Sequence, residues 1–152
     1  MTEKRQRELI KSGRLDPADA WIDLRDAESG KSVTPNAASV HWNDFRKCYV
    51  MIAQEIGGTA SFCGEIWYSE APRPEGPWQW ARKIVTHRQY TFYNPCHHPF
   101  FDEKGGRIIY FEGTYTDEFS GAKEKTPRYN YNQIMYRLDL GDPRLRLPKP
   151  RS

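Results

Sequence analysis

Apolar and polar positions alternate in a series of short runs through the middle of the chain. The run RKCYVMIAQE at 46–55 is rich in Tyr, Val and Ile and stops just before Gly57-Gly58. Runs of period two that are bounded by turn residues are typical of strands in antiparallel sheets. The pattern therefore predicts a meander of four strands. These strands are expected at residues 38–44, 46–55, 64–70 and 78–86.

A second, looser copy of the pattern follows. It opens with FYNPCHHPFF at 92–101, in which CHHPFFD at 96–102 resembles SVHWND at 39–44. We predict that this segment is the opening strand of the copy, with Pro95 and Pro99 bracketing its entry. Two further strands are expected at 106–115 and 132–140, with a long loop at 116–131 between them.

A repeated antiparallel unit of four strands is typical of a β-propeller blade. The predicted fold class is all-β: a partial β-propeller of about two four-stranded antiparallel blades, at about 37–88 and 92–141. A closed ring takes about four to eight blades of about 40 to 45 residues each. A chain of 152 residues is therefore expected to be a fragment of a larger propeller, within a module at 21–148.

The two ends of the chain have different patterns. Residues 1–20 have weak helical spacing and predict an N-terminal arm or frayed helix. Residues 21–33 alternate apolar and acidic positions and predict one edge strand. The proline-rich end cannot continue a sheet, so no fourth strand is evident in the second blade, and 149–152 is expected to be a tail.

Composition narrows the class of protein. Aromatic residues make up 14% of the chain, and 23 basic residues nearly balance 20 acidic ones. This balance gives no basic face for nucleic acid. Three cysteines without a CxxC pair imply no disulfide framework. With no apolar leader or membrane-length apolar run, we expect a cytoplasmic protein without a membrane partner. A secreted or periplasmic location would follow if an N-terminal part is missing.

Two stretches resemble known families. The turn YSEAPRPEGPW at 68–78 resembles the blade hairpin of five-bladed propeller glycosidases such as family-43 glycoside hydrolases. The strings NPCHHPFF, FEGTY and YNQIMYRLDL are similar to the C-terminal part of an uncharacterised bacterial family with a glycosidase-like propeller. The resemblance covers about residues 37–148. It implies a five-bladed ring, of which this chain holds the C-terminal blades, and a carbohydrate-related role. The catalytic base of such enzymes belongs to the first blade, so it maps onto no residue here.

Glu112 is the candidate catalytic acid. It follows the apolar run IIYF within a predicted strand, and burial beside aromatic side chains would raise its pKa, as a general acid requires. The alternative is that Glu112 accepts hydrogen bonds from backbone or tyrosine groups. Glu55, in the matching position of the first copy, is expected to be a solvated strand end.

His97 and His98 are candidate substrate contacts, because the resemblance implies that the first strand of a blade lines a central channel. In an extended strand Cys96 and His98 face one side and His97 the other. His41 occupies the analogous place in the first copy and could join them in space. Two ligands do not complete a zinc site, so we expect no metal. The other candidate substrate-binding residues are Tyr93, Asn94 and Tyr115.

Other chemistries lack motifs. There is no GxSxG elbow, no activated cysteine and no phosphate-binding glycine loop, so we expect no cofactor. The expected function is a carbohydrate-related propeller module that resembles a glycoside hydrolase but is incomplete and non-catalytic as this chain stands. The alternative is a non-enzymatic sugar-binding or assembly module. Open blade edges could also pair copies into a homo-oligomer.

Overall fold

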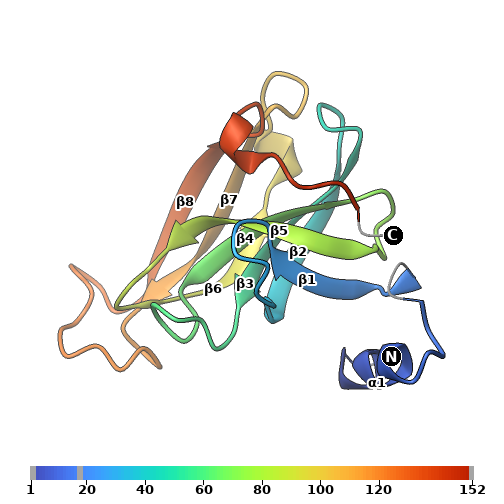
Figure 1. The fold of residues 1–152 in the computed structure, drawn as a ribbon. Coiled ribbons are helices and arrows are strands. Elements are labelled where there is room, and N and C mark those ends of the chain that lie inside the picture. The colour runs from blue at the N-terminus through green and yellow to red at the C-terminus, as the bar shows by residue number, and fades with distance from the viewer. Residues whose placement is uncertain (1–2, 17–18, 151–152) are drawn as a thin grey trace.

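Eight strands in two sheets form the framework of the protein (Figure 1). The structure is a computed structural model that describes residues 3–16 and 19–150. Its helical elements are α1 (Glu3–Lys11), η2 (Pro99–Phe101) and η3 (Pro143–Leu145). Its strands are β1 (Ile22–Asp26), β2 (Pro35–Asn43), β3 (Cys48–Glu55), β4 (Glu65–Ala71), β5 (Trp78–Thr86), β6 (Thr91–His97), β7 (Ile108–Thr116) and β8 (Asn132–Asp139). The all-β class is confirmed.

The first sheet has the strand order β1-β5-β4-β3-β2. Strands β2 to β5 form the predicted antiparallel meander, and β1 joins the outer edge parallel to β5. The second sheet has the order β6-β7-β8 and is antiparallel throughout. The predicted edge strand near the N-terminus is therefore present.

The first sheet contains the predicted four-stranded meander but has one strand more, and the second sheet lacks the fourth strand that was not evident in the sequence. The first sheet has five strands, because β1 adds a parallel pair. The second has three, and after β8 the described chain turns through η3 into an extended tail. Proline at 143, 148 and 150 removes the backbone donors that a fourth strand would need.

The predicted opening strand at 92–101 is present in its first part only. The strand is Thr91–His97, and Pro99–Phe101 form a turn of 3₁₀-helix. Proline fixes φ near the helical value and suits the first position of such a turn. The two prolines thus have different roles, since Pro95 lies within β6 while Pro99 ends the extended segment.

The main core lies between the two sheets. Its largest buried members include Tyr68, Phe92, Phe111 and Ile52. A second cluster covers the opposite face of the first sheet and contains Trp67. Neighbouring positions in β4 serve different clusters, because Ile66 and Tyr68 face the second sheet whereas Trp67 faces away from it.

The strands β2 and β6 are the neighbouring edges of the two sheets, and β6 packs against β2 and β3. Hydrogen bonds across this junction come from side chains. The His97 backbone N–H donates to Ser39 Oγ at 2.9 Å, and Asn43 Nδ2 donates to the Gly106 carbonyl at 2.8 Å. Gly106 has φ +86°, and a Cβ there would meet Asn43 Nδ2 at 2.8 Å, so this junction requires glycine.

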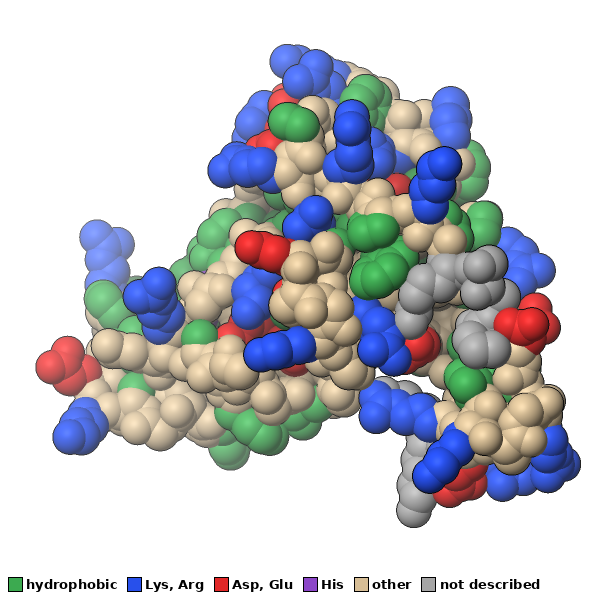
Figure 2. Space-filling model, viewed as in Figure 1, with side chains coloured by type: hydrophobic (Ala, Val, Ile, Leu, Met, Phe, Trp, Pro, Cys, Tyr) green, Lys and Arg blue, Asp and Glu red, His purple; other side chains and the backbone are tan. Residues whose placement is uncertain are grey.

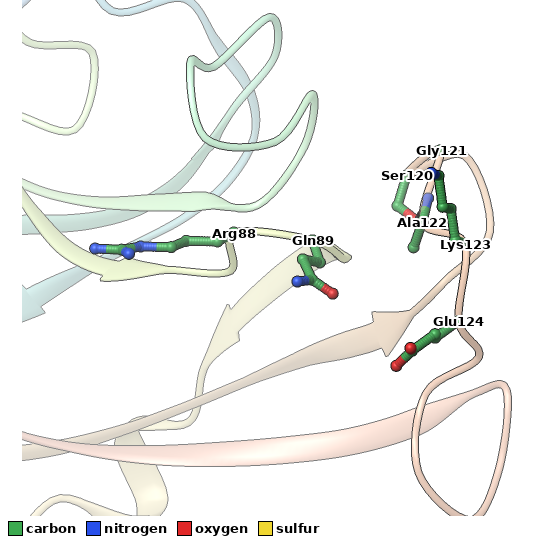
Figure 3. Close-up of a pocket in the computed structure, with 7 residues that line it drawn as sticks. All are labelled: Arg88, Gln89, Ser120, Gly121, Ala122, Lys123 and Glu124. Carbon is green, nitrogen blue, oxygen red and sulfur yellow. Dashed lines mark hydrogen bonds between the residues drawn. The ribbon is translucent and has the colours of Figure 1, made fainter.

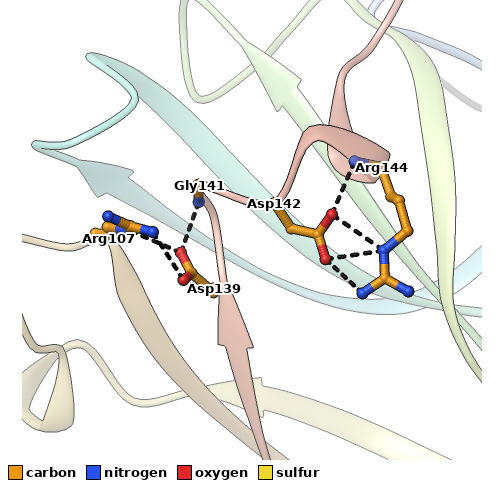
Figure 4. Close-up of polar contacts among 5 residues, drawn as sticks. All are labelled: Arg107, Asp139, Gly141, Asp142 and Arg144. Carbon is orange, nitrogen blue, oxygen red and sulfur yellow. Dashed lines mark hydrogen bonds and ion pairs between the residues drawn. The ribbon is translucent and has the colours of Figure 1, made fainter.

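The turn after β8 is fixed by two ion pairs (Figure 4). Arg107 binds both carboxylate oxygens of Asp139, at 2.9 and 3.1 Å, and Asp142 caps η3 through the Arg144 backbone N–H. The chain then returns across the first sheet, where Trp80 Nε1 donates to the Lys149 carbonyl at 3.0 Å. Lys and Arg side chains gather on the upper part of the face in Figure 2, the region that holds η3 and the tail in Figure 1.

The N-terminal helix contacts the first sheet beside β1 (Figure 1). Only α1 is a helix of more than one turn among the described residues, and it is too short to cross a bilayer.

Candidate functional site

The end of β6 directs its two imidazoles to opposite sides of the second sheet. His97 is 2% exposed and lies against the first sheet, with its ring 5.2 Å from His41 in an edge-to-face arrangement. His98 lies on the other side of the strand and remains partly exposed. The expected alternation of the histidines is confirmed, and so is the approach of His41.

The turn after β6 gives His97 a carboxylate partner. Asp102 follows η2, and its Oδ1 lies 2.8 Å from His97 Nε2. The other ring nitrogen, Nδ1, is buried and has no hydrogen-bond partner. A carboxylate on one nitrogen fixes the orientation of an imidazole and directs the second nitrogen elsewhere, here into the junction between the sheets.

His41 is held toward its neutral form. Burial lowers its pKa below 6.5, and the neighbouring His97 and His98 lower it further, while Asp102 acts in the opposite direction. At the junction of the sheets, His41 is therefore favoured as a neutral ring in edge-to-face contact with His97. No group of three or more His, Cys, Asp or Glu in the described part of the chain is arranged to hold a metal ion.

On the outer side of the second sheet, His98 meets Glu112. His98 Nε2 lies 3.1 Å from Glu112 Oε1; His98 directly follows β6, and Glu112 belongs to β7. Cross-strand pairing explains the contact, because Cys96 faces Glu112 and the His98 backbone N–H bonds to the Tyr110 carbonyl one step further along. The expected burial of Glu112 beside aromatic rings is wrong, since its side chain is 30% exposed and pairs with an imidazole.

Two exposed phenylalanines lie beside this pair. Phe100 and Phe101, in η2, are 76% and 48% exposed, and their ring centroids are 4.4 Å apart. The His98 ring is 5.4 Å from Phe100. We call His98, Phe100, Phe101 and Glu112 the aromatic–imidazole surface. It combines exposed apolar rings with a carboxylate and an imidazole that can accept and donate hydrogen bonds.

The other predicted site residues are not all brought to this surface. Tyr93 pairs with Thr114, on the same side of the sheet as Glu112. An irregularity in the strand pairing separates Tyr93 from Cys96, and the Tyr93 ring is 6.4 Å from the Tyr131 ring. Asn94 sits in that irregularity with φ +53° and is exposed. Tyr93 and Asn94 are separated from His98 by the last residues of β6.

Tyr115 lies on the opposite face of the second sheet. Its ring is 5.0 Å from Tyr90 and 5.4 Å from His87, and it packs against the core between the sheets. Successive side chains of a strand point to opposite faces, and Tyr115 is three positions after Glu112, so the two side chains lie on opposite faces. Tyr115 and Glu112 therefore cannot contact one bound molecule on the same face.

The sequence interpretation missed Asp102, Phe100 and Phe101 as members of the site. Their signal was present in the string HHPFFD. Because a proline after two extended residues favours a turn, it could have indicated that the following rings and carboxylate fold back onto the histidines.

Cys48 and Cys63 are not activated as nucleophiles. Burial, assisted by the charge of Glu70, raises the pKa of Cys48 to about 11, and burial raises the pKa of Cys63. A nucleophilic thiolate needs the opposite shift.

A hollow of about 410 Å³ lies between the loop after β5 and the long loop after β7 (Figure 3). Gln89 and Glu124 point toward the space between the two loops, whereas Arg88 points away from it. Its lining contains exposed side chains of both charges and no aromatic ring, so it lacks the apolar contact area of the aromatic–imidazole surface.

No family model, curated protein or solved structure matches this chain. The arguments for its function therefore depend on its own residues and on their arrangement.

Proposed function

We propose that the protein is a carbohydrate-binding module built from two propeller-type blades, and that sugar binds at the aromatic–imidazole surface without being cleaved. The observation that carries this proposal is the His98–Glu112 pair, at 3.1 Å, beside the exposed rings of Phe100 and Phe101. The resemblance of 68–78 and of strings within 94–140 to glycosidase-like propellers supports the same substrate class.

The blade interpretation is supported by the order of the strands. Each sheet begins at an edge strand, β2 or β6, and continues outward by hairpins. The two starting strands are neighbours, as the innermost strands of adjacent blades are. The second unit is one strand short of a blade in the described residues, and other parts of a ring would have to come from chain beyond them or from further copies.

Sugar recognition requires two kinds of contact, and the surface offers both. The C–H faces of a pyranose pack on aromatic rings, while its hydroxyls need partners of fixed position. The Phe100 and Phe101 rings supply apolar area, and the second oxygen of Glu112 and the imidazole of His98 supply hydrogen-bonding groups. Tyr110, from the same side of β7, donates its hydroxyl to Glu103 at 2.7 Å and extends the polar rim.

Glycoside hydrolysis is the second candidate, because Glu112 is a carboxyl group within this surface. Hydrolysis normally uses two carboxyl groups that flank the scissile bond. The other carboxyl groups near the end of β6 are both engaged, because Asp102 Oδ1 lies 2.8 Å from the buried His97 Nε2 and Glu103 Oε1 accepts from the Tyr110 hydroxyl. Binding without turnover is therefore favoured.

Binding is tested with purified protein on a panel of immobilised polysaccharides, with Phe100→Ala as the variant and Phe119→Ala as its matched control. Phe119 is also highly exposed, at 81%, but lies in the loop after β7. We expect saturable binding that Phe100→Ala weakens by about tenfold or more, a loss of about 1.4 kcal/mol, and that Phe119→Ala leaves unchanged.

Hydrolysis of aryl-glycosides is measured in parallel, with the native protein and with the Glu112→Gln variant. Hydrolysis that Glu112→Gln abolishes would replace the binding module with an enzyme. The absence of saturable polysaccharide binding, or binding that Phe119→Ala weakens as much as Phe100→Ala, would overturn the proposal.

A further inference from the structure

A pocket of about 390 Å³ lies where the C-terminal tail meets one end of the first sheet. The tail contributes residues 146–148 and Pro150, and the sheet contributes the turn before β3, the end of β4 and the start of β5. The hydrogen bond from Trp80 Nε1 to the Lys149 carbonyl, at 3.0 Å, holds the tail against the sheet. The volume is at the lower end of the range for pockets that hold small organic ligands.

Most of the lining is apolar. Four of the lining residues are prolines, and Trp80, Leu147, Ala71 and Cys48 are also among them. Proline has no rotamer freedom to lose on burial, so its ring offers a preformed surface to the hydrocarbon part of a ligand. Burial raises the pKa of Cys48 to about 11, so its thiol stays neutral and adds no charge.

The charged side chains of the lining are unbalanced. Arg46, Lys47 and Arg146 are basic, whereas Glu70 is the one acidic residue among them. In a partly enclosed space with apolar walls, such an excess of one sign attracts a ligand of the opposite sign more strongly than it would in water. The pocket therefore favours an anion and disfavours a cation.

Charged neighbours outside the lining do not cancel this excess. Asp44 pairs with Lys47 at 3.4 Å and adds one carboxylate. Arg82, which donates to the Arg146 carbonyl, and Lys149 add two cations. This agrees with the gathering of Lys and Arg side chains on the upper part of the face in Figure 2. Two nearby ion pairs contribute no net charge: Arg73–Glu75 and Arg144–Asp142.

Arg46 is already oriented for a second carboxylate. Its Nε lies 2.6 Å from Glu70 Oε1, and the Tyr68 hydroxyl donates to the same oxygen, so Glu70 is occupied and the guanidinium is fixed. The two Nη groups of Arg46 have no hydrogen-bond partner among the described residues, and they form an edge that can bind a carboxylate through two parallel hydrogen bonds. The Arg146 side chain is exposed and pairs with no carboxylate in the described part of the chain.

We propose that this pocket binds a small organic carboxylate, with Arg46 and Arg146 donating to its oxygens and with the prolines and Trp80 in contact with its hydrocarbon part. A ligand of this class matches both the sign of the charge and the apolar walls. The pocket shares no residue with the aromatic–imidazole surface, so the inference goes beyond sugar binding, and each site can fail its test without affecting the other.

The test uses phenylacetate as the probe and phenylacetamide as its neutral counterpart. The indole N–H resonance of Trp80 is followed in NMR titrations of the full chain, and Trp80→Phe identifies that resonance. We expect phenylacetate to shift it saturably with a Kd of about 1 mM or tighter, and phenylacetamide to bind at least about tenfold more weakly.

An arginine variant separates the site from general charge effects. Arg146→Gln should weaken phenylacetate binding by about fivefold to tenfold. It removes the charge but leaves the backbone carbonyl to which Arg82 donates. Arg88→Gln is the matched control, because Arg88 is an exposed arginine in the loop after β5, outside this pocket. It should leave the affinity unchanged.

A variant of opposite sign completes the test. Glu70→Gln should tighten phenylacetate binding, because it removes the carboxylate that repels the probe while its amide oxygen can still accept from Arg46. Equal affinities for phenylacetate and phenylacetamide, a shift that does not saturate, or equal effects of Arg146→Gln and Arg88→Gln would overturn the proposal. If Glu70→Gln does not fold, the comparison of the two arginine variants decides the matter, since both positions are exposed.

Discussion

His87 shows how one side chain is fixed by its two ring nitrogens. Nδ1 lies 2.8 Å from the Gly64 carbonyl, which can only accept, so Nδ1 carries the proton. Nε2 then accepts from the Tyr136 hydroxyl at 2.9 Å. Because Tyr136 belongs to β8 and Gly64 precedes β4, this neutral imidazole joins the two sheets through the core.

Stability should fall as the pH falls below about 6.5, and His87 should be one cause. Burial lowers its pKa below the ordinary value of 6.5, with Gly64 and Glu65 opposing this only in part. The unfolded chain therefore takes up a proton at a higher pH than the folded one, so stability is complete above 6.5 and is lost as the pH falls toward the folded pKa. The slope from one histidine cannot exceed about 1.4 kcal/mol per pH unit.

Urea unfolding between about pH 5 and 8 measures this slope. His87→Gln should make it shallower, and the remaining slope should come from His41, whose pKa burial also lowers. Tyr136→Phe is the control, because it removes a hydroxyl and leaves the buried imidazole. An unchanged slope in His87→Gln would show that His87 does not titrate as described.

At the scale of elements, the N-terminal helix depends on one glutamine. Gln6 is 3% exposed, and its Oε1 accepts from the Trp21 backbone N–H at 2.8 Å while its Nε2 donates to the Ile22 carbonyl at 2.6 Å. A side-chain amide thus supplies both a donor and an acceptor to the start of β1. Local spacing predicts only a weak helix here, and the contact that holds the helix joins residues that are far apart in the chain.

Gln6→Ala should release α1 from the first sheet. It leaves a backbone donor and acceptor of β1 without their partners, at a cost of about 1 to 3 kcal/mol. We expect faster tryptic cleavage within residues 5–14 and faster hydrogen exchange at the start of β1.

Glu8→Ala is the matched control, since Glu8 lies on the exposed side of the same helix and its carboxylate pairs with Arg5 at 3.2 Å. If both variants are cleaved at the same rate, the helix is not held by Gln6.

At the scale of the whole molecule, the chain after β8 closes the core between the sheets. Leu140 and Leu145 are 1% and 6% exposed and belong to the same cluster as Val50 and Ile52 of the first sheet. Arg82 Nε donates to the Arg146 carbonyl at 3.2 Å, so the tail is bound to the first sheet directly after leaving the second. The two sheets should therefore unfold as one unit.

Leu145→Ala should destabilise both sheets together, by about 2 to 5 kcal/mol, the usual range for a buried leucine. Hydrogen exchange of β3 and β7 amides measures the effect in each sheet, and both should accelerate by the same factor. Leu147→Ala, at a partly buried position beside the cluster, should have the smaller effect. Acceleration in β7 alone would mean that the second sheet opens independently.

The alternation of apolar residues by itself determined where β3, β4, β5, β7 and β8 lie, because strand formation and facing follow from local period. It also brought His97 and His98 to opposite faces. The parallel pairing of β1 and the Glu112–His98 contact were decided only by the tertiary structure. Each depends on which segments become neighbours once two sheets bury a common core, and that packing is a property of the whole chain rather than of any short stretch.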